Sequence, residues 1–176
     1  KISTITADND QRYGGRSSAI SGDGNFIAIG SDINNRMGDK GPVTTYKRTS
    51  GNNWVKVGTP IFKEPHRSKF GTSISLSEDG SVMAVGAPGD NGTGSAHIFK
   101  LINNQWQQIS SPISGKKSQD KFGFSVSLSK DGNIVAIGSP QSEYDSKSNT
   151  GTTVLYKNVG GSWIKYGNDI LGEETS

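Results

Sequence analysis

Cysteine is absent from the 176-residue sequence, so disulfide bonds contribute nothing to its stability, although their absence does not exclude secretion. Hydrophobic residues make up only 30% of the chain, which favours several thin sheets over one thick core. No apolar run approaches the ~18 residues of a membrane span, so we expect no membrane insertion. The net charge of +3 is spread along the chain, so we expect no nucleic-acid binding either.

Motifs for catalysis and cofactor binding are also lacking. The chain has two histidines and contains neither a phosphate-binding loop nor a Gly-x-Ser-x-Gly nucleophile elbow. His97 lies between Ala96 and Ile98 inside an expected strand, where a packing or surface role is favoured over that of a general base. We therefore expect no enzymatic activity, no catalytic residues, no cofactor and no metal site.

The sequence does contain one pattern written three times. The clearest copy runs from Phe122 to Pro140, the second from Phe70 to Pro88, and a more divergent copy from Gly14 to Asp32. A period of about 50 residues is typical of stacked repeats and propellers. On this basis the chain divides into the tail of a preceding repeat (1–13), repeat 1 (14–69), repeat 2 (70–121) and repeat 3 (122–176).

Each repeat predicts four short strands and no helix longer than a turn. In repeat 3, Phe122, Phe124, Val126 and Leu128 alternate with glycine and serine, and this period of two indicates a strand. The face that carries the serines is small, which suits the close approach of a neighbouring sheet.

Three further features recur in register. An Asp-Gly pair after the first strand predicts a hairpin turn, because glycine accepts a positive φ; the pairs are Asp23-Gly24, Asp79-Gly80 and Asp131-Gly132. The second strand is an apolar run that implies burial on both faces, and we expect a glycine to end it, at Gly30, Gly86 or Gly138. A third strand is expected at 42–46, 95–99 and 152–156, and a tryptophan opens the fourth, at Trp54, Trp106 or Trp163.

Four antiparallel strands in a repeat of this length form the blade of a β-propeller. The sequence thus predicts an all-β fold, a β-propeller segment of about three four-stranded antiparallel blades in one continuous arc. Propellers close with about four to eight blades, so we expect two uncovered apolar faces and association with another chain or with further repeats. The chain begins at Lys1 in mid-pattern, which indicates a processed product or a piece of a longer protein.

The recurring Phe-Gly-x-Ser-x-Ser-Leu-Ser start, with Val-Gly-Ala-Pro at 85–88 and Ile-Gly-Ser-Pro at 137–140, resembles the FG-GAP repeats of integrin α-subunit propellers. It is still more similar to the FG-GAP-like repeats of large secreted or surface proteins of algae, protists and bacteria. The resemblance covers essentially the whole chain, but repeat 1 has Gly14 in place of the phenylalanine and Ser31-Asp32 in place of Ala-Pro. It implies an extracellular or cell-surface propeller that serves recognition or construction and not catalysis.

Three candidate sites follow from these motifs. Integrin-type blades often carry an Asp-x-Asp-x-Asp-Gly calcium loop, but each matching loop here offers one Asp and at most one other acid, which favours structural turns. The tryptophans recur at one blade position, which favours packing between sheets over the alternative of stacking on sugars. Asn91-Gly-Thr93 is the one N-glycosylation acceptor pattern, and we expect it in an exposed loop.

The main hypothesis is a non-enzymatic structural or recognition module of an extracellular, cell-surface or filament protein, which mediates protein-protein assembly or adhesion. The alternative is a carbohydrate-binding lectin whose ring is completed by self-association. Length variation gathers between strands two and three, and that loop shares one end of the blade with the connector after strand four. We expect this end to meet a protein or an anionic glycan through Lys63, His66, Arg67, Lys69, Lys116, Lys117 and Lys121.

Overall fold

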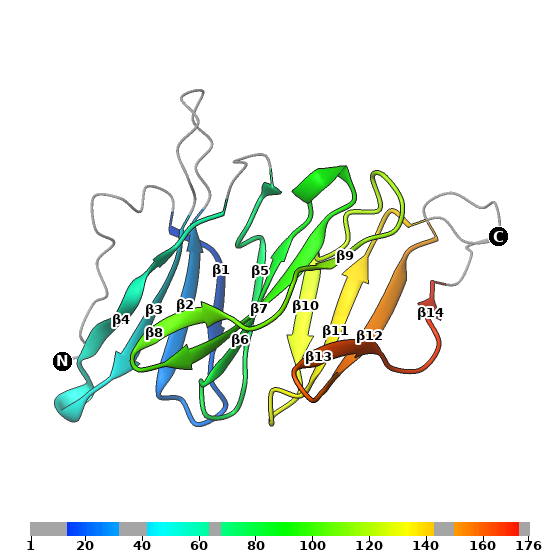
Figure 1. Cartoon of the computed structure of the whole chain (residues 1–176). Coiled ribbons are helices and arrows are strands. Elements are labelled where there is room, and N and C mark those ends of the chain that lie inside the picture. The colour runs from blue at the N-terminus through cyan, green and yellow to red at the C-terminus, as the bar shows by residue number, and fades with distance from the viewer. Residues whose placement is uncertain (1–13, 32–41, 64–67, 143–149, 173–176) are drawn as a thin grey trace.

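The computed structural model describes residues 14–31, 42–63, 68–142 and 150–172, which form three antiparallel sheets side by side (Figure 1). Blade 1 has the strand order β1 (Gly14–Ile20), β2 (Phe26–Ser31), β3 (Val43–Arg48), β4 (Trp54–Ile61). Blade 2 has the order β5 (Ser73–Leu76), β6 (Val82–Ala87), β7 (Ser95–Ile102), β8 (Gln105–Gln108), with β9 (Ile113–Ser114) also on β7. Blade 3 has the order β10 (Ser125–Leu128), β11 (Ile134–Ser139), β12 (Thr152–Val159), β13 (Ser162–Lys165), with β14 (Ile170–Leu171) on β12.

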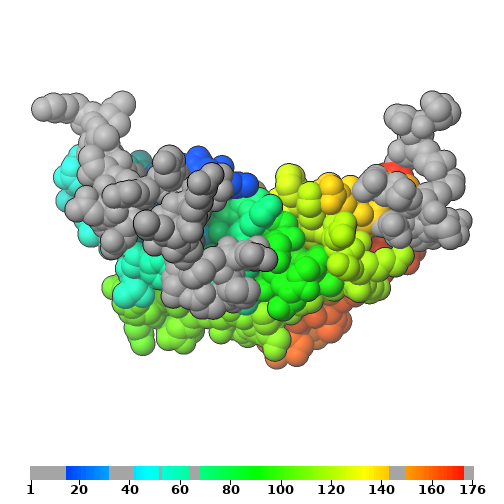
Figure 2. Space-filling view, turned by 90° about the horizontal axis from the view of Figure 1, so that it is seen from above, coloured from blue at the N-terminus to red at the C-terminus, as the bar shows by residue number. Residues whose placement is uncertain are grey.

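This architecture confirms the predicted fold class, an all-β propeller segment of three blades. Helical structure in the described ranges consists of the short 3-10 turns η1 (Ser50–Asn52) and η3 (Asp90–Gly92) and of Ser68, and no helix there is long and apolar enough to cross a membrane. Seen from above, the first strands of the blades lie along one side of the molecule and the outer strands β8 and β13 along the other (Figure 2). β1 packs on β5, β5 packs on β10, and β4 packs on β8.

The three Asp-Gly pairs form the predicted hairpin turns. Gly24, Gly80 and Gly132 have φ of 69°, 67° and 69°, and each donates its N–H to the carbonyl of the serine three residues before it. In blade 2 the Asp79 carboxylate accepts hydrogen bonds from the hydroxyl of Ser77 and from the backbone N–H of Ser81. The carboxylate therefore stabilises the turn itself, in agreement with the prediction of a structural turn in place of a calcium loop.

Two details of the predicted strands are wrong. Gly30, Gly86 and Gly138 do not end the second strands but lie inside β2, β6 and β11 and keep their ladder partners. The Phe-Gly pairs precede the first strands instead of belonging to them, because Gly71 and Gly123 have φ of 84° and 83°, which interrupts an extended strand.

Phe124 is a further departure from the predicted strand pattern. Phe122 is buried in the core, whereas half of the Phe124 side chain is exposed, so these two residues do not share one face. The positive φ of Gly123 turns the chain between them and breaks the alternation there. The period of two holds only from Ser125 onward.

A division of the outer edge was not predicted from the sequence. In blade 1 the fourth strand, β4, continues to Ile61 across a register irregularity and pairs with Val43. In blades 2 and 3 the same edge is built from two pieces, β8 with β9 and β13 with β14. In blade 2 the second piece, β9, returns the chain to the end where blade 3 begins.

The hydrophobic core is two clusters, one at each junction between blades. Met83, Val85 and Phe99 of blade 2 pack against Phe26 and other residues of blade 1. The opposite face of blade 2 contributes Ala84, Ala96 and Ile98, which pack on Val135 and Ile137 of blade 3. Among the described residues, blade 2 thus packs against a neighbouring blade on both faces, and each end blade on one.

Small residues let the sheets approach closely at both junctions. The hydroxyl of Ser17 donates to the carbonyl of Gly71 at 2.6 Å, and the hydroxyl of Ser73 donates to the carbonyl of Gly123 at 3.0 Å. These carbonyls stand where a Cβ on Gly30 or on Gly86 would be, so the strand glycines are required by the following blade. Gly71 and Gly123 are buried by this contact.

We expect Gly86→Ala to lower the free energy of unfolding by about 1–3 kcal/mol, the usual cost of overpacking. Its added Cβ overlaps the Gly123 carbonyl, a backbone atom of the next blade that cannot rotate away. The matched control is Gly138→Ala at the same position of blade 3, where the overlapping atom is the rotatable hydroxyl of Ser125. Urea unfolding of both variants measures the difference. Equal losses of unfolding free energy would contradict the contact between Gly86 and the Gly123 carbonyl.

Candidate functional site

The loop between the second and third strands and the connector to the next blade meet at one end of the molecule, the upper end in Figure 1. In blade 2 this end holds the turn η3 and the connector that runs through β9 to β10. The Asp-Gly turns lie at the opposite end. The predicted division into a loop end and a turn end is therefore present in blade 2, whereas the loops of the other two blades lie mostly outside the described residues.

A buried polar cluster anchors the loop end of blade 2. The hydroxyl of Ser95 lies 2.6 Å from Asp90 Oδ2 and 2.8 Å from His97 Nε2. Lys63 reaches the same carboxylate oxygen from blade 1, with Nζ at 3.5 Å. Asp90 belongs to η3, while Ser95 and His97 belong to β7, so the cluster ties the loop to the sheet and the connector to both.

The hydrogen bonds around His97 assign its tautomer. The amide nitrogen of Gln108 donates to the carbonyl of Ser110, so its oxygen faces His97 Nδ1 at 3.3 Å and accepts from it. Burial lowers the pKa of His97 below 6.5, and the charge of Lys63 lowers it further, while Gln108 and Asp90 act in the opposite direction. With Gln108 accepting, neutral His97 carries its proton on Nδ1, while the Ser95 hydroxyl beside Nε2 donates its single proton to Asp90 Oδ2.

This arrangement differs from a catalytic triad in its connectivity. In a triad the carboxylate holds Nδ1 and the nucleophile lies on Nε2. Here Asp90 and Ser95 both lie on the Nε2 side, and Gln108 occupies Nδ1. Ser95 and His97 are each only 1% exposed, so a substrate has no path to either group. The cluster fits a structural lock.

The packing role predicted for His97 is confirmed. Its ring lies edge-on to Phe70 with centroids 5.5 Å apart and stacks on Phe99 at 6.5 Å. The acid beside it was not identified from the sequence, because Asp90 comes from a loop whose path no periodicity predicts. The one available signal was an acid five residues before a serine on a buried strand.

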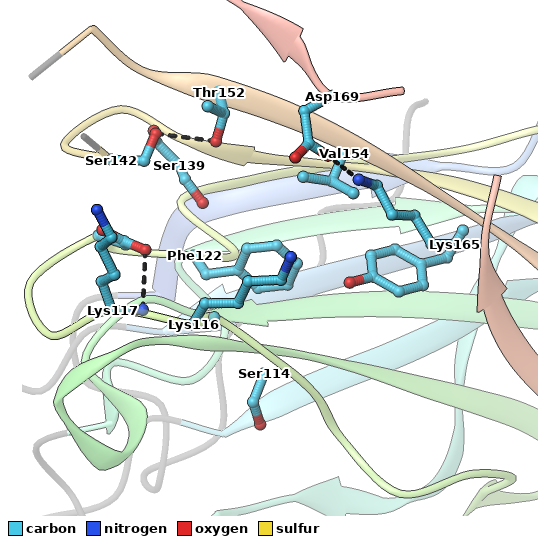
Figure 3. A pocket seen from close by; sticks show the side chains of 13 residues that line it. Ser114, Lys116, Lys117, Phe122, Ser139, Ser142, Thr152, Val154, Lys165 and Asp169 are labelled. Atoms are coloured by element: carbon cyan, nitrogen blue, oxygen red, sulfur yellow. Dashed lines mark hydrogen bonds and ion pairs between the residues drawn. The ribbon is translucent and has the colours of Figure 1, made fainter. Parts of the chain in front are cut away.

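A pocket of about 110 Å³ occupies the equivalent position of blade 3 (Figure 3). Strand register aligns Val154 with His97, since they pair with Ile137 and Val85 at the same position of β11 and β6. The smaller valine leaves space that the imidazole fills in blade 2. The pocket has an apolar wall of Phe122, Val154 and Tyr156.

Charged side chains surround the mouth of this pocket. Lys165 extends past Val154 to Asp169, with Nζ and Oδ1 2.8 Å apart (Figure 3). Burial and the charge of Asp169 raise the pKa of Tyr156, so its phenol stays neutral and can both donate and accept. The pocket is smaller than the roughly 300–1,000 Å³ of most ligand sites and fits a few water molecules.

The basic residues predicted at the loop end are only partly gathered. Lys69, Lys116 and Lys117 are exposed there, and Lys121 is half-buried. Lys63 turns inward to Asp90 instead of facing a partner. The remaining two predicted residues, His66 and Arg67, lie outside the described residues. Asn91 is exposed in η3, and its glycosylation stays a prediction.

The packing interpretation of the tryptophans is confirmed at both junctions. Trp106 packs on the first core cluster and donates its indole N–H to Thr45 of blade 1 at 2.7 Å. Trp163 packs on the second cluster, but its indole N–H has no hydrogen-bond partner in the described part of the chain. Strand register explains the difference, because blade 2 has Ile98 where blade 1 has Thr45.

The lowered pKa of His97 predicts a pH-dependent stability. Its contribution is complete above pH 6.5, the ordinary value, and is lost as the pH falls below 6.5 through the lower pKa of the folded state. We expect His97→Gln, which cannot titrate, to lose less unfolding free energy than the wild type between pH 7.5 and about 5. Urea unfolding across this range measures both, and parallel curves would contradict a neutral buried His97.

Comparison with known proteins finds a family match for one part of the chain. Residues 66–99, which span the Phe-Gly loop, the Asp-Gly turn and the Gly-Ala-Pro segment of blade 2, match the FG-GAP repeat family. A search of curated protein sequences finds no match.

Two solved structures match this chain at low sequence identity. One is TolB from Acinetobacter baumannii, at 18% identity and a TM-score of 0.49, over 85% of this chain and 31% of that one. The other is a TolB from Agrobacterium tumefaciens, at 12% identity and a TM-score of 0.36, over 86% of this chain and 61% of that one. The chain thus spans less than two thirds of either. The segment 66–99 of this three-blade β-propeller fold is thus similar to an FG-GAP repeat.

Proposed function

We propose that this chain is a non-enzymatic assembly module, a propeller segment of an extracellular or cell-surface protein. Its uncovered blade faces would bind other protein chains or further repeats of the same polypeptide. The observation that carries the proposal is a difference in burial between equivalent positions of the middle and end blades. The resemblance of the repeats to those of secreted and surface proteins supports the location.

Blade 1 exposes apolar residues that blade 2 buries. Ile20 and Leu76 occupy the same position of β1 and β5, yet Ile20 is 61% exposed and Leu76 only 9%. Ile27 is half-buried, whereas its counterpart Met83 is fully buried under blade 1. A sheet face with this pattern is built to be covered, because each aliphatic side chain fully buried contributes about 1.5–3 kcal/mol.

Blade 3 repeats the pattern on its opposite face. Ala96 and Ile98 of β7 are fully buried by blade 3, but their counterparts Thr153 and Leu155 of β12 are only half-buried. Each end blade therefore leaves apolar residues exposed on one face, although Thr44 and Tyr46 on that face of blade 1 are buried. The lectin alternative gains no support from Trp106 or Trp163, because both indole rings are packed between sheets.

We expect the isolated chain to self-associate, with a weight-average mass that rises with concentration in sedimentation velocity. A charge on either uncovered face, Ile27→Glu or Leu155→Glu, should weaken this association at least tenfold. The matched controls are Gln107→Glu and Ser162→Glu, which add the same charge at exposed polar positions. A wild-type chain that stays monomeric at every concentration would refute assembly through these faces.

The loop end supplies a second contact surface in this proposal, for an anionic glycan or an acidic protein. Lys69 and Lys116 are exposed there, and we expect their reversal to glutamate to abolish retention on a sulfated-polysaccharide resin at low salt. The control, Lys100→Glu with Lys130→Glu, makes the same change in net charge at exposed sites away from that end. Equal loss of retention in both variants would show that only net charge matters.

A further inference from the structure

We propose that a groove on blade 3 is a docking site for a Phe-Gly-x-Ser segment, the one that opens a following repeat of this type. The groove, here named the blade-3 groove, has a volume of about 370 Å³ and includes Ser125, Gly138, Thr150, Gly151, Ile170 and Gly172. This inference rests on the proposed assembly function and deepens it by naming the segment that one uncovered face recognises.

The groove corresponds, position by position, to the place where blade 2 holds the Phe-Gly pair of blade 3. The strand ladders align Ser125 with Ser73 and Gly138 with Gly86, because each pair forms the same β-bridge. They also align Ile170 with Ile113, which pair with Thr153 and Ala96 on the third strands. The receptor side of the contact is therefore already folded in blade 3.

The backbone of the docked segment is recognised by two features of the receptor. At both internal junctions a serine hydroxyl donates to the carbonyl of the Phe-Gly glycine, at 2.6 Å from Ser17 and 3.0 Å from Ser73. The equivalent hydroxyl of Ser125 is exposed and makes no such bond within the described ranges. Gly138 is buried, and within the described ranges the atom nearest to a Cβ added there is the rotatable hydroxyl of Ser125 and not a backbone carbonyl of a following blade.

The phenylalanine of the segment is held by a second set of contacts. Phe122 donates its N–H to the carbonyl of Thr93 at 3.1 Å and forms a parallel bridge with Gly94. Its Cβ lies so close to Gly115 that no side chain fits there. Blade 3 offers the same backbone at Thr150, Gly151 and Gly172, where the N–H of Gly172 bonds to the carbonyl of Gly151 as Gly115 bonds to Gly94.

The exposure of Ile170 marks the missing side chain. Its counterpart Ile113 is 8% exposed and belongs to the same core cluster as Phe122, whereas Ile170 is 59% exposed. A phenyl ring seated as Phe122 is seated would cover Ile170. The groove thus lacks an aromatic group at one end and a glycine carbonyl at the other, which together are the Phe-Gly signature.

The Phe-Gly pairs of this chain are already engaged, because Phe70 and Phe122 are both buried at internal junctions. The first blade offers Gly15 with φ of 92°, close to the 84° of Gly71, but the residue before it is Gly14, which has no ring for Ile170. The chemistry of the groove therefore selects a true Phe-Gly-x-Ser segment over the first blade of a second copy.

The test is a titration of the full chain, labelled with 15N, with a nine-residue peptide that copies residues 121–129, Lys-Phe-Gly-Phe-Ser-Val-Ser-Leu-Ser. We expect amide shifts centred on Gly138, Gly151 and Gly172. Replacing the peptide glycine by valine, or its first phenylalanine by alanine, should weaken binding at least tenfold. Gly138→Ala in the chain should do the same, and Ser125→Ala should weaken binding several-fold.

Each result decides the proposal. Shifts that are absent, that gather at the exposed face of blade 1, or that are equal for all three peptides would overturn it. Shifts that persist unchanged in Gly138→Ala would also overturn it, provided the spectrum of that variant shows a folded chain. If the chain associates in sedimentation but binds no Phe-Gly peptide, the result supports the proposed assembly function and contradicts the docking site. A chain that binds the peptide but stays monomeric would support the docking site and contradict the proposed assembly function.

Discussion

The close approach of successive sheets at their glycine and serine residues is the contact on which the rest of the fold depends. At each junction a serine hydroxyl donates a hydrogen bond to a backbone carbonyl of the next blade, and a glycine without a side chain leaves room for that carbonyl. Toward the outer edge the gap is wider, and Trp106 and Trp163 fill it. Small residues near the first strands and large ones near the fourth give each blade a wedge-shaped contact, which is the geometry that turns stacked sheets into a propeller.

Most of this fold could be predicted from the repeat, because the periodicity indicates which residues face a neighbouring sheet. The four strands, the Asp-Gly turns and the packing of the tryptophans all follow from residues that recur in register. The ends of the strands could not be predicted in this way. A glycine looks the same in a sequence whether it ends a strand or admits a neighbouring backbone, and the carbonyl that decides between these at Gly86 comes from Gly123 in another repeat.

The candidate sites were less predictable because they arise where the repeats differ. One position of the third strand is Thr44 in blade 1, His97 in blade 2 and Val154 in blade 3, with a buried polar lock in the second case and a pocket in the third. Alignment of the repeats identifies the position but not its surroundings. Asp90 and Lys63, which complete the lock, come from segments with no periodic pattern and meet only through the packing of two blades.

The two uncovered faces of the segment are chemically different, and this difference constrains how it can be completed. Blade 3 carries the serine, the strand glycine and the isoleucine that lie against a Phe-Gly pair in blade 2, whereas blade 1 opens with Gly14 and offers no ring in return. In repeat proteins each unit is stabilised chiefly by its immediate neighbours. A head-to-tail contact between copies would bury the apolar faces but leave Ile170 without its aromatic partner, so a repeat that begins with Phe-Gly satisfies blade 3 better than the chain itself does.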